Sequence, residues 1–479
     1  MEEVNLLHIS DTHIVASRTL KKSTKSTQIQ LAKSLKKFID ENNEFDMNII
    51  TGDITYDDNY DDALENARDF LFSDYVLKTD GNIGLNLNAK KTIIVPGNQD
   101  LAKDFTSDLK EWWKESIAPF NSTFNEISAI IPSEENGITF YYTVINTIPL
   151  LYVILDTSYL SGSDKDRGRG TSKRQREKLL NEQISIMLSS FTTKNGFYEF
   201  KSNNESIKIS KYEYKKVIKI LVMHHFLFDP SNITNIKSLS IKQSTQRNLF
   251  KNLLLSDFDL ILCGHKHRQN ESNLLNIDSI DYRSKRRFYF DILRNKMGYK
   301  KRFFQLNDKE NQNISKPSSL ILYFIAAYAE DVKFVKLVKN IFKDIKNNNK
   351  IKLPNEFVEL VLNNNLDAMT SLEDKKLDLY NYLCEKFDKN TIQKIIKYGK
   401  PIVVSLENEF RKRDIVQISA GASTHDNKNT KSKRFIKTIK IVKDKNGYRI
   451  IPSTYELCED KLDYISIKKD NLNILVKTF

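Results

Sequence analysis

The sequence has few cysteines and lacks any long apolar segment. Its three cysteines, Cys263, Cys384 and Cys458, lie far apart among 479 residues, and none shows the spacing of a metal site. We therefore expect reduced thiols, as in a cytoplasmic protein. No stretch of 18 or more apolar residues predicts a membrane span, and no charged segment with an apolar core precedes the first apolar run. Neither membrane association nor a signal peptide is expected, and no repeat of fixed period is present.

The length of the chain predicts more than one folded unit. At 479 residues it exceeds the ~250–300 residues at which a single core stops growing. There are 75 basic and 62 acidic residues, which give a formal net charge of +13. Such a charge favours a polyanionic partner or substrate. The basic residues are spread out, however, and a compositional bias toward Lys, Asn and Ile explains the excess more readily.

Five short polar motifs occur in order along the chain, and each follows a short apolar run typical of a buried strand. The motifs are Asp11-Thr12-His13, Gly52-Asp53, Gly97-Asn98-Gln99-Asp100, His224-His225 and Gly264-His265-Lys266-His267. The apolar runs before them are residues 4–9, 47–50, 92–95, 217–223 and 260–263. Polar groups at the carboxyl ends of parallel strands point into one crevice, so we expect these side chains to gather there. Asp, Asn and His without Cys form the donor set of hard to borderline divalent metals.

The order and spacing of the motifs resemble the calcineurin-like metallophosphoesterase superfamily, whose pattern is D-x-H, G-D, G-N-H-D/E, H and G-H-x-H. The resemblance covers residues 1–269 and a later segment. It implies a phosphoesterase with two divalent cations, ~3.5–4 Å apart, that clamp a phosphoryl group while a hydroxide between them attacks phosphorus. Mn²⁺ is the metal we expect first, with Fe, Zn or Ni as alternatives.

The resemblance also implies a role for the motif residues. Asp53 would bridge the two cations, because like charges held close together need a shared anion. The remaining ligands of one cation would be Asp11, His13 and His267, and those of the other would be Asn98, His224 and His265. Through these contacts Asp53 and Asn98 would also be catalytic. His8 lies within the first strand, and we expect it in the core or supporting the site.

The third motif departs from the family pattern at Gln99, where the family has His. That His contacts the phosphate or the leaving-group oxygen and can act as a general acid. Glutamine has no titrating proton, although its amide can still hydrogen-bond an oxygen. The chain is then either an enzyme for substrates with a tolerable leaving group or with an acid from elsewhere, or a degenerate binding module. The intact metal ligands favour the enzyme.

His225 follows the expected ligand His224 and is the first candidate for a replacement acid. Its position favours a supporting role or a substrate contact, and metal ligation is the second alternative. Arg167 and Arg169 belong to a basic segment that continues to Arg176. Such a cluster can steer phosphates toward a site, although a solvated loop is the more common interpretation.

Apolar periodicity and the resemblance together predict an α/β fold, a four-layer β-sandwich flanked by helices. Helices are predicted at residues 26–38, 61–72 and 175–188, paired strands at 140–144 and 149–155, and a break at Pro119. A strand at 415–419 and a hairpin at 435–451 return to the sandwich much later than the family pattern places them. Residues 1–269 and 413–479 would therefore form the metallophosphoesterase domain, and residues 270–412 a mostly helical insertion.

The first part of the insertion, residues 281–304, is basic and aromatic. This composition suits single-stranded nucleic acid, although an ordinary amphipathic segment is more common. The insertion would be a cap that selects substrate or a docking surface for a protein partner. We predict a cytoplasmic, dinuclear metal-dependent phosphodiesterase that acts on a nucleotide or nucleic acid. The alternatives are a nuclease of the repair-nuclease type and a catalytically weak sensor or scaffold.

Overall fold

The structure is a computed structural model that describes part of the chain. The described residues are 2–14, 22–42, 45–55, 60–73, 84–101, 108–160, 173–191, 193–194, 196–201, 206–227, 249–250, 252–254, 256–265, 272–275, 414–421, 434–458, 463–469 and 474–478. The chain divides into two units, residues 1–275 with 414–479 and residues 276–413. The second unit lies outside the described residues. Within the described residues, no helix is long and apolar enough to cross a membrane.

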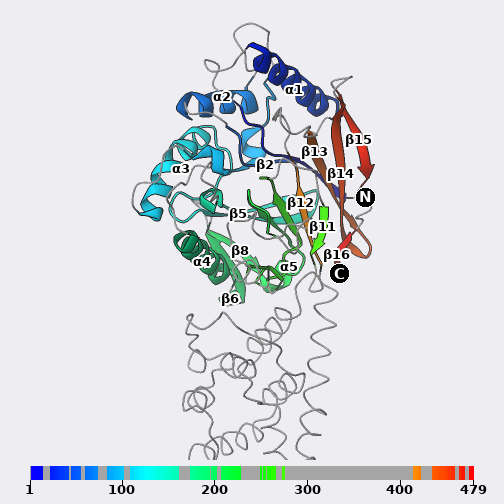
Figure 1. Cartoon of the computed structure of the whole chain (residues 1–479). Helices are drawn as coiled ribbons and strands as arrows, with labels where there is room; N and C mark the ends of the chain where they lie inside the picture. The colour runs from blue at the N-terminus through cyan, green and yellow to red at the C-terminus, as the bar shows by residue number, and fades with distance from the viewer. Residues whose placement is uncertain are drawn as a thin grey trace, which may run out of the picture. The chain divides into compact units, whose positions relative to one another are not determined.

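The first sheet joins the two ends of the chain. Its strands are β1 (Glu2–Ile9), β2 (Met47–Thr51), β3 (Thr92–Val95), β13 (Phe435–Asp444), β14 (Gly447–Cys458), β15 (Asp463–Lys469) and β16 (Ile474–Thr478). They follow the order β15-β14-β13-β1-β2-β3, and β16 pairs with β14. Strand β1 pairs in parallel with β2 and antiparallel with β13, so the C-terminal strands lie beside the N-terminal one (Figure 1). The late hairpin predicted from the sequence is confirmed as β13 and β14.

The second sheet carries the strands that precede the two histidine motifs. Its strands are β4 (Ile138–Ile145), β5 (Ile148–Leu155), β9 (Ile218–Val222), β10 (Leu260–Cys263), β11 (Ser272–Leu275) and β12 (Ile415–Ser419). They follow the order β11-β12-β10-β9-β5-β4, with the central four strands parallel. The predicted strand at 415–419 is confirmed as β12, next to β10. The two neighbours of β10 are thus far apart in the sequence.

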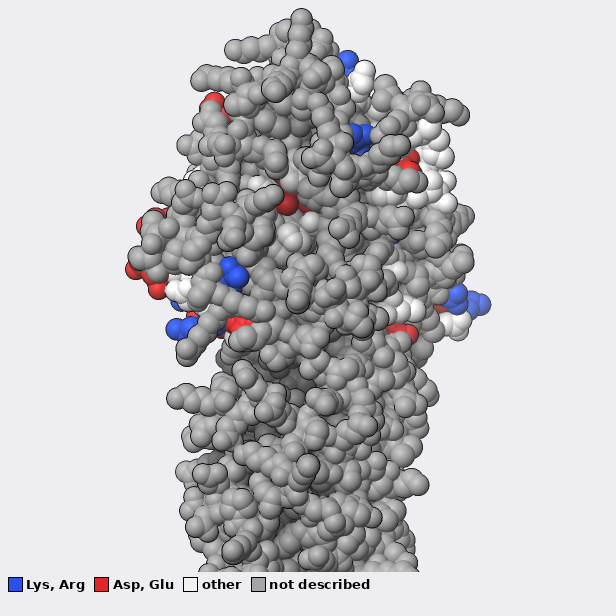
Figure 2. Space-filling view, viewed as in Figure 1, with Lys and Arg blue, Asp and Glu red and all other residues white. Residues whose placement is uncertain are grey.

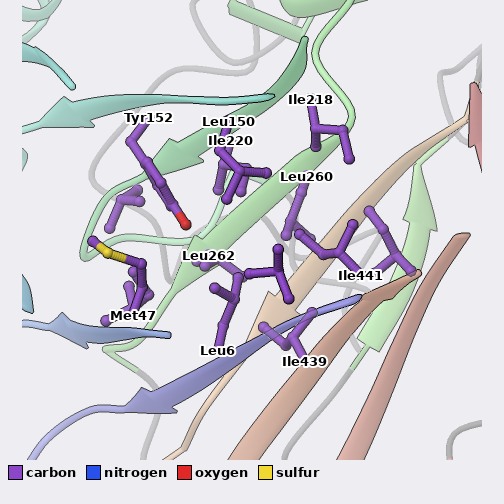
Figure 3. Packing of buried hydrophobic residues seen from close by; sticks show 14 of the residues in the cluster. Leu6, Met47, Leu150, Tyr152, Ile218, Ile220, Leu260, Leu262, Ile439 and Ile441 are labelled. Carbon is purple, nitrogen blue, oxygen red and sulfur yellow. The ribbon is translucent and has the colours of Figure 1, made fainter. Parts of the chain in front are cut away.

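The two sheets pack against each other through a continuous apolar core. Alternate residues of the strands point into it, as the two-residue period of a strand requires. From the first sheet, Leu6 and Ile439 point toward Leu150, Ile220 and other side chains of the second sheet (Figure 3). Burial of one such aliphatic side chain stabilises the fold by roughly 1.5–3 kcal/mol. This core fixes how the strand ends of one sheet lie relative to those of the other.

The described helices are α1 (Lys22–Glu41), α2 (Tyr60–Phe72), α3 (Leu109–Asn125), α4 (Lys173–Ser190) and the short α5 (Lys211–Tyr214). The predicted helices at 26–38, 61–72 and 175–188 are confirmed as α1, α2 and α4. Helix α1 packs on the first sheet, where the Phe38 ring lies 4.8 Å from Tyr455 and 5.8 Å from Tyr464. The mixed α/β class is confirmed, whereas the four-layer order stays a prediction.

The predicted break at Pro119 is wrong, because α3 continues through it. The Asp108 carboxylate begins this helix by accepting hydrogen bonds from the backbone N–H groups of Lys110 and Glu111. A proline in a helix interior costs about 3 kcal/mol. The buried rings of Phe120 and Phe124, with centroids 4.8 Å apart, lie on the turn after Pro119. Tertiary packing therefore outweighs the local penalty.

Three further features of the fold were not foreseen. A small sheet of β6 (Thr193–Lys194), β7 (Phe197–Lys201) and β8 (Ser206–Ser210) follows α4. Residues 463–478, where no strand was predicted, contain β15 and β16. Residues 272–275, assigned to the insertion, form β11 of the second sheet. The rest of the insertion lies outside the described residues, so its helical content stays a prediction.

Candidate metal centre

The polar motifs lie directly after the parallel strands of both sheets. The first sheet contributes Asp11 and His13 after β1, Asp53 after β2, and Asn98 in the short helix η2 (Asn98–Asp100) after β3. The second sheet contributes His224 and His225 after β9 and His265 after β10. All of these side chains except that of His265 are buried. The site is thus assembled where the carboxyl ends of the strands of the two sheets meet.

Two groups of potential metal ligands form within this site. Asp11, His13 and Asp53, which we call the acidic triad, come from the first sheet, and one ligand atom of each lies within 4.8 Å of those of the other two. His224, His225 and His265, which we call the histidine triad, come from the second sheet and meet the same distance. Asp11 and His13 belong to one expected ligand set and His224 and His265 to the other, whereas Asn98, expected with these two histidines, comes from the first sheet, and His225 is an additional member.

His224 connects the two triads. Its Nδ1 lies 2.7 Å from the backbone oxygen of Thr51, which can only accept a hydrogen bond, so Nδ1 carries the hydrogen. Nε2 points into the site, where it can bind a metal ion once it has lost its proton. This nitrogen lies 3.1 Å from Nδ1 of His265, 3.3 Å from Oδ1 of Asn98 and 3.5 Å from Oδ2 of Asp53. Four donor atoms therefore converge from four separate loops.

Asp53 lies at the centre of the site and is held as a carboxylate. Its Oδ1 accepts a hydrogen bond of 2.9 Å from the backbone N–H of Gln99, and its Oδ2 faces His224. Burial by itself would raise the pKa of Asp53, but the surrounding imidazoles, above all His224, hold it well below its usual range. The Asp53 charge in turn outweighs the effect of burial on His224 and raises the pKa of that imidazole to about 9. The site therefore attracts positive charge strongly.

Asp11 ties the acidic triad to the loop of the other sheet. Its Oδ2 accepts hydrogen bonds from Ser10 Oγ at 2.5 Å and from the backbone N–H of His265 at 3.2 Å. Ser10 Oγ also lies 3.0 Å from the backbone oxygen of Thr51. The backbone oxygen of Thr51 thus contacts both Ser10 and the ring of His224. Such supporting contacts fix the direction of metal ligands.

The motif glycines are required because the loops approach too closely for a side chain. A Cβ atom on Gly264 would lie 1.8 Å from Ser10 Oγ and 2.6 Å from the backbone oxygen of Thr51. A Cβ on Gly97 would lie 2.2 Å from the backbone nitrogen of Asp53. Gly52 has φ +81° and faces His224. Loops from β2, β3, β9 and β10 therefore pack backbone to backbone at the site.

Four of the expected ligands adopt left-handed backbone conformations. The φ angles are 51° for Asp11, 46° for His13, 49° for Asp53 and 73° for His265. Non-glycine residues in this region cost of order 1–3 kcal/mol each and cluster at functional sites. The sharp turns aim successive side chains of one loop at the site. Their concentration in the motif residues is an independent sign of function.

Asp100 holds the second and third motifs together, a role that the sequence did not reveal. Its Oδ1 accepts hydrogen bonds from the backbone N–H of Thr55 at 2.8 Å and from the Thr55 hydroxyl at 2.9 Å. Its Oδ2 accepts from the backbone N–H groups of Gly97 at 2.8 Å and Ile54 at 3.1 Å. Burial, together with the charge of Asp53, raises the pKa of Asp100 to about 6. The carboxylate fastens the loop that presents Asn98 and Gln99.

His225 is oriented by Thr157, a residue that has no place in the five motifs. Thr157 Oγ1 accepts a hydrogen bond of 3.2 Å from the backbone N–H of His225 and lies 3.1 Å from its Nδ1. Nε2 of His225 is buried and makes no hydrogen bond with the described residues. Burial, with the nearby charges of His265 and His224, holds the pKa of His225 well below its usual range. The neutral ring lies against His265, with centroids 4.3 Å apart.

The strand that delivers Thr157 is β5, and its end is also well anchored. Asp156 accepts a hydrogen bond of 2.6 Å from Trp113 Nε1 and one of 2.8 Å from the backbone N–H of Ser158. His8, as expected, lies in the core and supports the site, since its Nε2 lies 3.0 Å from Thr51 Oγ1. Sequence alone offered only the dipeptide Asp156-Thr157 at a predicted strand end as a signal for this part of the site.

The residues present fit a divalent metal centre. The donors are carboxylate oxygens, one amide oxygen and imidazole nitrogens, the set preferred by Mn, Fe and Zn. The outer nitrogen of His224 is fixed by a backbone carbonyl, the usual support of a metal-binding His. Nε2 of His224 and Nδ1 of His265 approach to 3.1 Å. A cation bound there would replace the proton of His224 and would be held by both nitrogens and by the nearby carboxylates.

Three of the expected site residues lie outside the described part of the chain. These are the ligand His267 and the substrate-binding candidates Arg167 and Arg169. The Gln99 side chain is intermediate in exposure, and its backbone N–H binds Asp53. On the face seen in Figure 2, the described Lys and Arg side chains are scattered and form no single basic patch.

Comparison with known proteins places the five motifs within one family. A sequence model of the calcineurin-like phosphoesterase family matches residues 4–269. Among solved structures, the chain is similar to a purple acid phosphatase from yellow lupin (Lupinus luteus) seeds, with 12% identity, 57% of this chain and 39% of that chain covered, and a TM-score of 0.33. It is also similar to the protein TT1561 of Thermus thermophilus, with 12% identity, 56% and 84% covered, and a TM-score of 0.27. A search of curated proteins finds no match.

The match over more than half of the chain shows that this protein belongs to the calcineurin-like phosphoesterase family. This confirms the family and the enzyme class predicted from the motifs, a metal-dependent phosphoester hydrolase. The chain spans 39% of the length of the lupin phosphatase. The substrate and the metals of this chain are therefore matters for proposal.

Proposed function

We propose that this protein is a dinuclear metal-dependent phosphodiesterase that acts on a nucleotide or nucleic acid. The observation that carries the proposal is that the acidic triad and the histidine triad meet, with Oδ2 of Asp53 3.5 Å from Nε2 of His224. Asp11, His13 and Asp53, with His267, would hold one cation. Asp53, Asn98, His224 and His265 would hold the other. When bound, two such cations polarise a phosphoryl group and activate water, and Mn²⁺ fits the mixed oxygen and nitrogen donors.

The protein side chains prepare the site for a phosphate ester in three ways. Asp53 provides the shared negative charge, and the backbone N–H of Gln99 and the nearby imidazoles keep it ionised. Asp100 and Thr51 hold the loops that present Asn98 and His224. The amide of Gln99 would donate a hydrogen bond to a substrate oxygen, without the ability to transfer a proton.

His225 supplies a second hydrogen-bond donor. Thr157 Oγ1 already accepts a backbone N–H, and its own hydrogen is available for Nδ1 of His225. That arrangement leaves the ring hydrogen on Nε2, the buried atom without a hydrogen-bond partner among the described residues. Nε2–H then binds a substrate oxygen, which favours a substrate contact over metal ligation for His225.

Gln99 sets the preference for diesters. A dianionic alkyl monoester has a poor leaving group that needs a proton donor. Gln99 therefore suits diesters and activated esters, and the net charge of +13 is compatible with any anionic ester. That the insertion binds a protein partner and that the protein is cytoplasmic are predictions from the sequence.

A substrate panel with added Mn²⁺ tests the proposal. We expect hydrolysis of bis-p-nitrophenyl phosphate that is abolished by EDTA and restored by Mn²⁺. A series from cyclic mononucleotides through oligonucleotides to duplex DNA then separates a nucleotide phosphodiesterase from a nuclease. Metal-loaded protein that hydrolyses no ester in the panel would contradict the proposal and support a binding module. A preference for alkyl monoesters over diesters would contradict the substrate assignment alone.

A further inference from the structure

Helix α4 carries a buried arginine, Arg176, near its N-terminus. The side chains of Arg176, Leu180, Gln183, Ile184 and Met187 recur at three and four residues and are all buried. They form one stripe of the helix, since positions three, four and seven apart share a face. Arg176 is the member of this stripe nearest the helix N-terminus and is only 7% exposed. The basic segment that contains it is therefore not simply solvated at this position.

The contacts of α4 show which way the stripe runs. Gln183 accepts a hydrogen bond from the Tyr159 hydroxyl and donates one of 3.2 Å to the backbone oxygen of Asn136. Tyr159 follows Thr157, which holds His225. Beyond the C-terminal end of α4, the Phe191 ring lies 5.4 Å from Phe258, which precedes β10 at the opposite, amino end of that strand. The N-terminal half of the helix therefore points toward the site.

The position of Arg176 relative to Gln183 follows from helix geometry. Seven residues separate them, which is about two turns and roughly 10 Å along the axis. Gln183 lies beside Tyr159. Two turns from there toward the N-terminus of α4 lead past the end of β5, where Thr157 lies. The guanidinium is also within electrostatic reach of His225. Burial and the two neighbouring imidazoles are the main causes of the lowered pKa of His225, and the charge of Arg176 adds to them.

A permanent positive charge at this place favours an anion nearby. Arginine stays protonated at any working pH, and its planar fork of five N–H donors matches the oxygens of a phosphate. The neighbouring Glu177 offsets part of the charge. With cations bound by the two triads, however, the guanidinium would face like charges, which repel each other unless an anion lies among them. A phosphate ester in the site is such an anion.

We propose that Arg176 is a substrate-binding residue that contacts the anionic oxygens of the phosphate ester beside His225. The inference rests on the proposed phosphoesterase function and deepens it. Arg176 supplies the fixed positive charge that Gln99, a neutral side chain, does not provide. The proposal thereby assigns one residue of the basic segment to the site. Its grounds are the burial of Arg176 and its place on α4, whereas Arg167 and Arg169 were candidates from the sequence alone.

Three variants test the proposal. Arg176→Gln removes the charge, and Arg176→Lys keeps the charge but loses the planar fork. Lys178→Gln is the matched control, because Lys178 lies on the same helix with its side chain 80% exposed. The measurements are kcat and KM for bis-p-nitrophenyl phosphate, the binding of inorganic phosphate to Mn²⁺-loaded protein by calorimetry, metal content and thermal melting.

We expect Arg176→Gln to weaken phosphate binding and to raise KM by roughly 10- to 100-fold, as the loss of a charge-assisted hydrogen bond does. Metal content and kcat should change much less, Arg176→Lys should be intermediate, and Lys178→Gln should equal the wild type. A folded, metal-loaded Arg176→Gln protein with unchanged phosphate binding would overturn the proposal. Equal losses of melting temperature in Arg176→Gln and Arg176→Lys, with phosphate affinity unaltered in what remains folded, would assign Arg176 to the core instead.

Failure of the proposed function and failure of the proposed role of Arg176 can be told apart, because phosphate binding is measured without turnover. If the wild type hydrolyses no ester but binds phosphate through Arg176, the proposed function fails and the anion site stands. If the wild type hydrolyses diesters and Arg176→Gln does so equally well, with the same phosphate affinity, the function stands and the role of Arg176 is refuted.

Discussion

The acidic triad and the histidine triad are built on different sheets and use different chemistry. The acidic triad has two carboxylates and one imidazole after β1 and β2, in loops with left-handed backbone at all three ligands. The histidine triad has only imidazoles, after β9 and β10, and one of its rings, His225, is held by a hydroxyl that follows β5. Oxygen ligands favour harder cations, whereas imidazoles suit Zn, Fe and other borderline metals. Each proposed cation site nonetheless combines two oxygen and two nitrogen donors, because Asp53 and Asn98 from the first sheet complete the ligand set of His224 and His265.

The difference shows why the site needs both sheets. Neither triad contains the ligands of a complete two-metal centre, and Asp53 is the member of the acidic triad that faces the histidine triad, 3.5 Å from His224. The contact of His265 with Asp11 across the junction joins the two halves a second time. The metal centre is thus a property of the packing between the sheets. Each prediction below disturbs one element of this arrangement.

The largest effect is expected from Asp53→Asn, which removes the negative charge shared by both halves. We expect loss of at least one metal ion per chain and a fall in diesterase activity on the order of 10³-fold, since loss of a single preorganised electrostatic group already costs ~10²–10³ in rate. Elemental analysis and turnover of bis-p-nitrophenyl phosphate measure the two effects. Wild-type turnover with this variant would refute a two-metal site bridged by Asp53.

The next effect concerns the loop of the first sheet that carries Gln99. Gln99→His restores the family residue and should raise activity on esters with poor leaving groups more than on p-nitrophenyl esters. A working general acid contributes on the order of 10²-fold, and we expect less than this because the surroundings of Gln99 are not shaped for an imidazole. The measurement is the ratio of the two rates before and after substitution. An unchanged ratio with full metal occupancy would mean that the acid lies elsewhere, and His225 would be tested next.

Gly264→Ala tests the junction of the two halves. Gly264 follows β10, and an added Cβ would meet Ser10 Oγ at 1.8 Å. We expect a loss of about 1–3 kcal/mol in the free energy of unfolding, as in other overpacked sites, together with weaker metal binding. Gly196→Ala is the control, because nothing lies within 4 Å of its Cβ although its φ is +83°. Chemical denaturation and metal titration should distinguish the two variants. Gly196→Ala should lose stability but keep its metal affinity, whereas Gly264→Ala should lose both. Unaltered metal affinity in Gly264→Ala would show that the junction tolerates displacement.

The smallest effect is a pH dependence of metal binding on the histidine side. In the metal-free protein the Asp53 charge outweighs burial and raises the pKa of His224 to about 9. Near neutral pH this imidazole therefore holds a proton that a metal ion must displace. Metal affinity should rise by about tenfold per pH unit up to the pKa of His224, with about one proton released per ion bound. Calorimetry in two buffers of different ionisation enthalpy measures the release. Equal heats in both buffers would contradict the elevated pKa.

Much of the fold was predictable because its strands and helices carry strong local patterns. The parallel strands are short apolar runs ended by polar motifs, and α1 and α2 show clear apolar periodicity. Pro119 was misjudged because its local penalty is visible in the sequence, whereas the packing of Phe120 and Phe124 that compensates for it is not. The third sheet and β15 were missed because their strands are short or partly exposed, so they alternate weakly.

The sequence by itself determined the inventory of the site. The identities, order and spacing of the motif residues are local properties, and from them came the family, the enzyme class and the expected ligands. The roles of Thr157 and Asp100 were not predicted. Their importance lies in what they contact, and nothing in their own neighbourhood in the chain indicates a partner.

Only the tertiary structure decided how these residues combine. Packing of the two sheets through one apolar core, with β1 beside β13 and β10 beside β12, joins segments that are far apart in the sequence. That packing puts His224 against Asp53, orients the His224 ring through the backbone oxygen of Thr51, and buries Arg176. Distances and burial depend on contacts between residues far apart in the chain, and a local pattern cannot encode them.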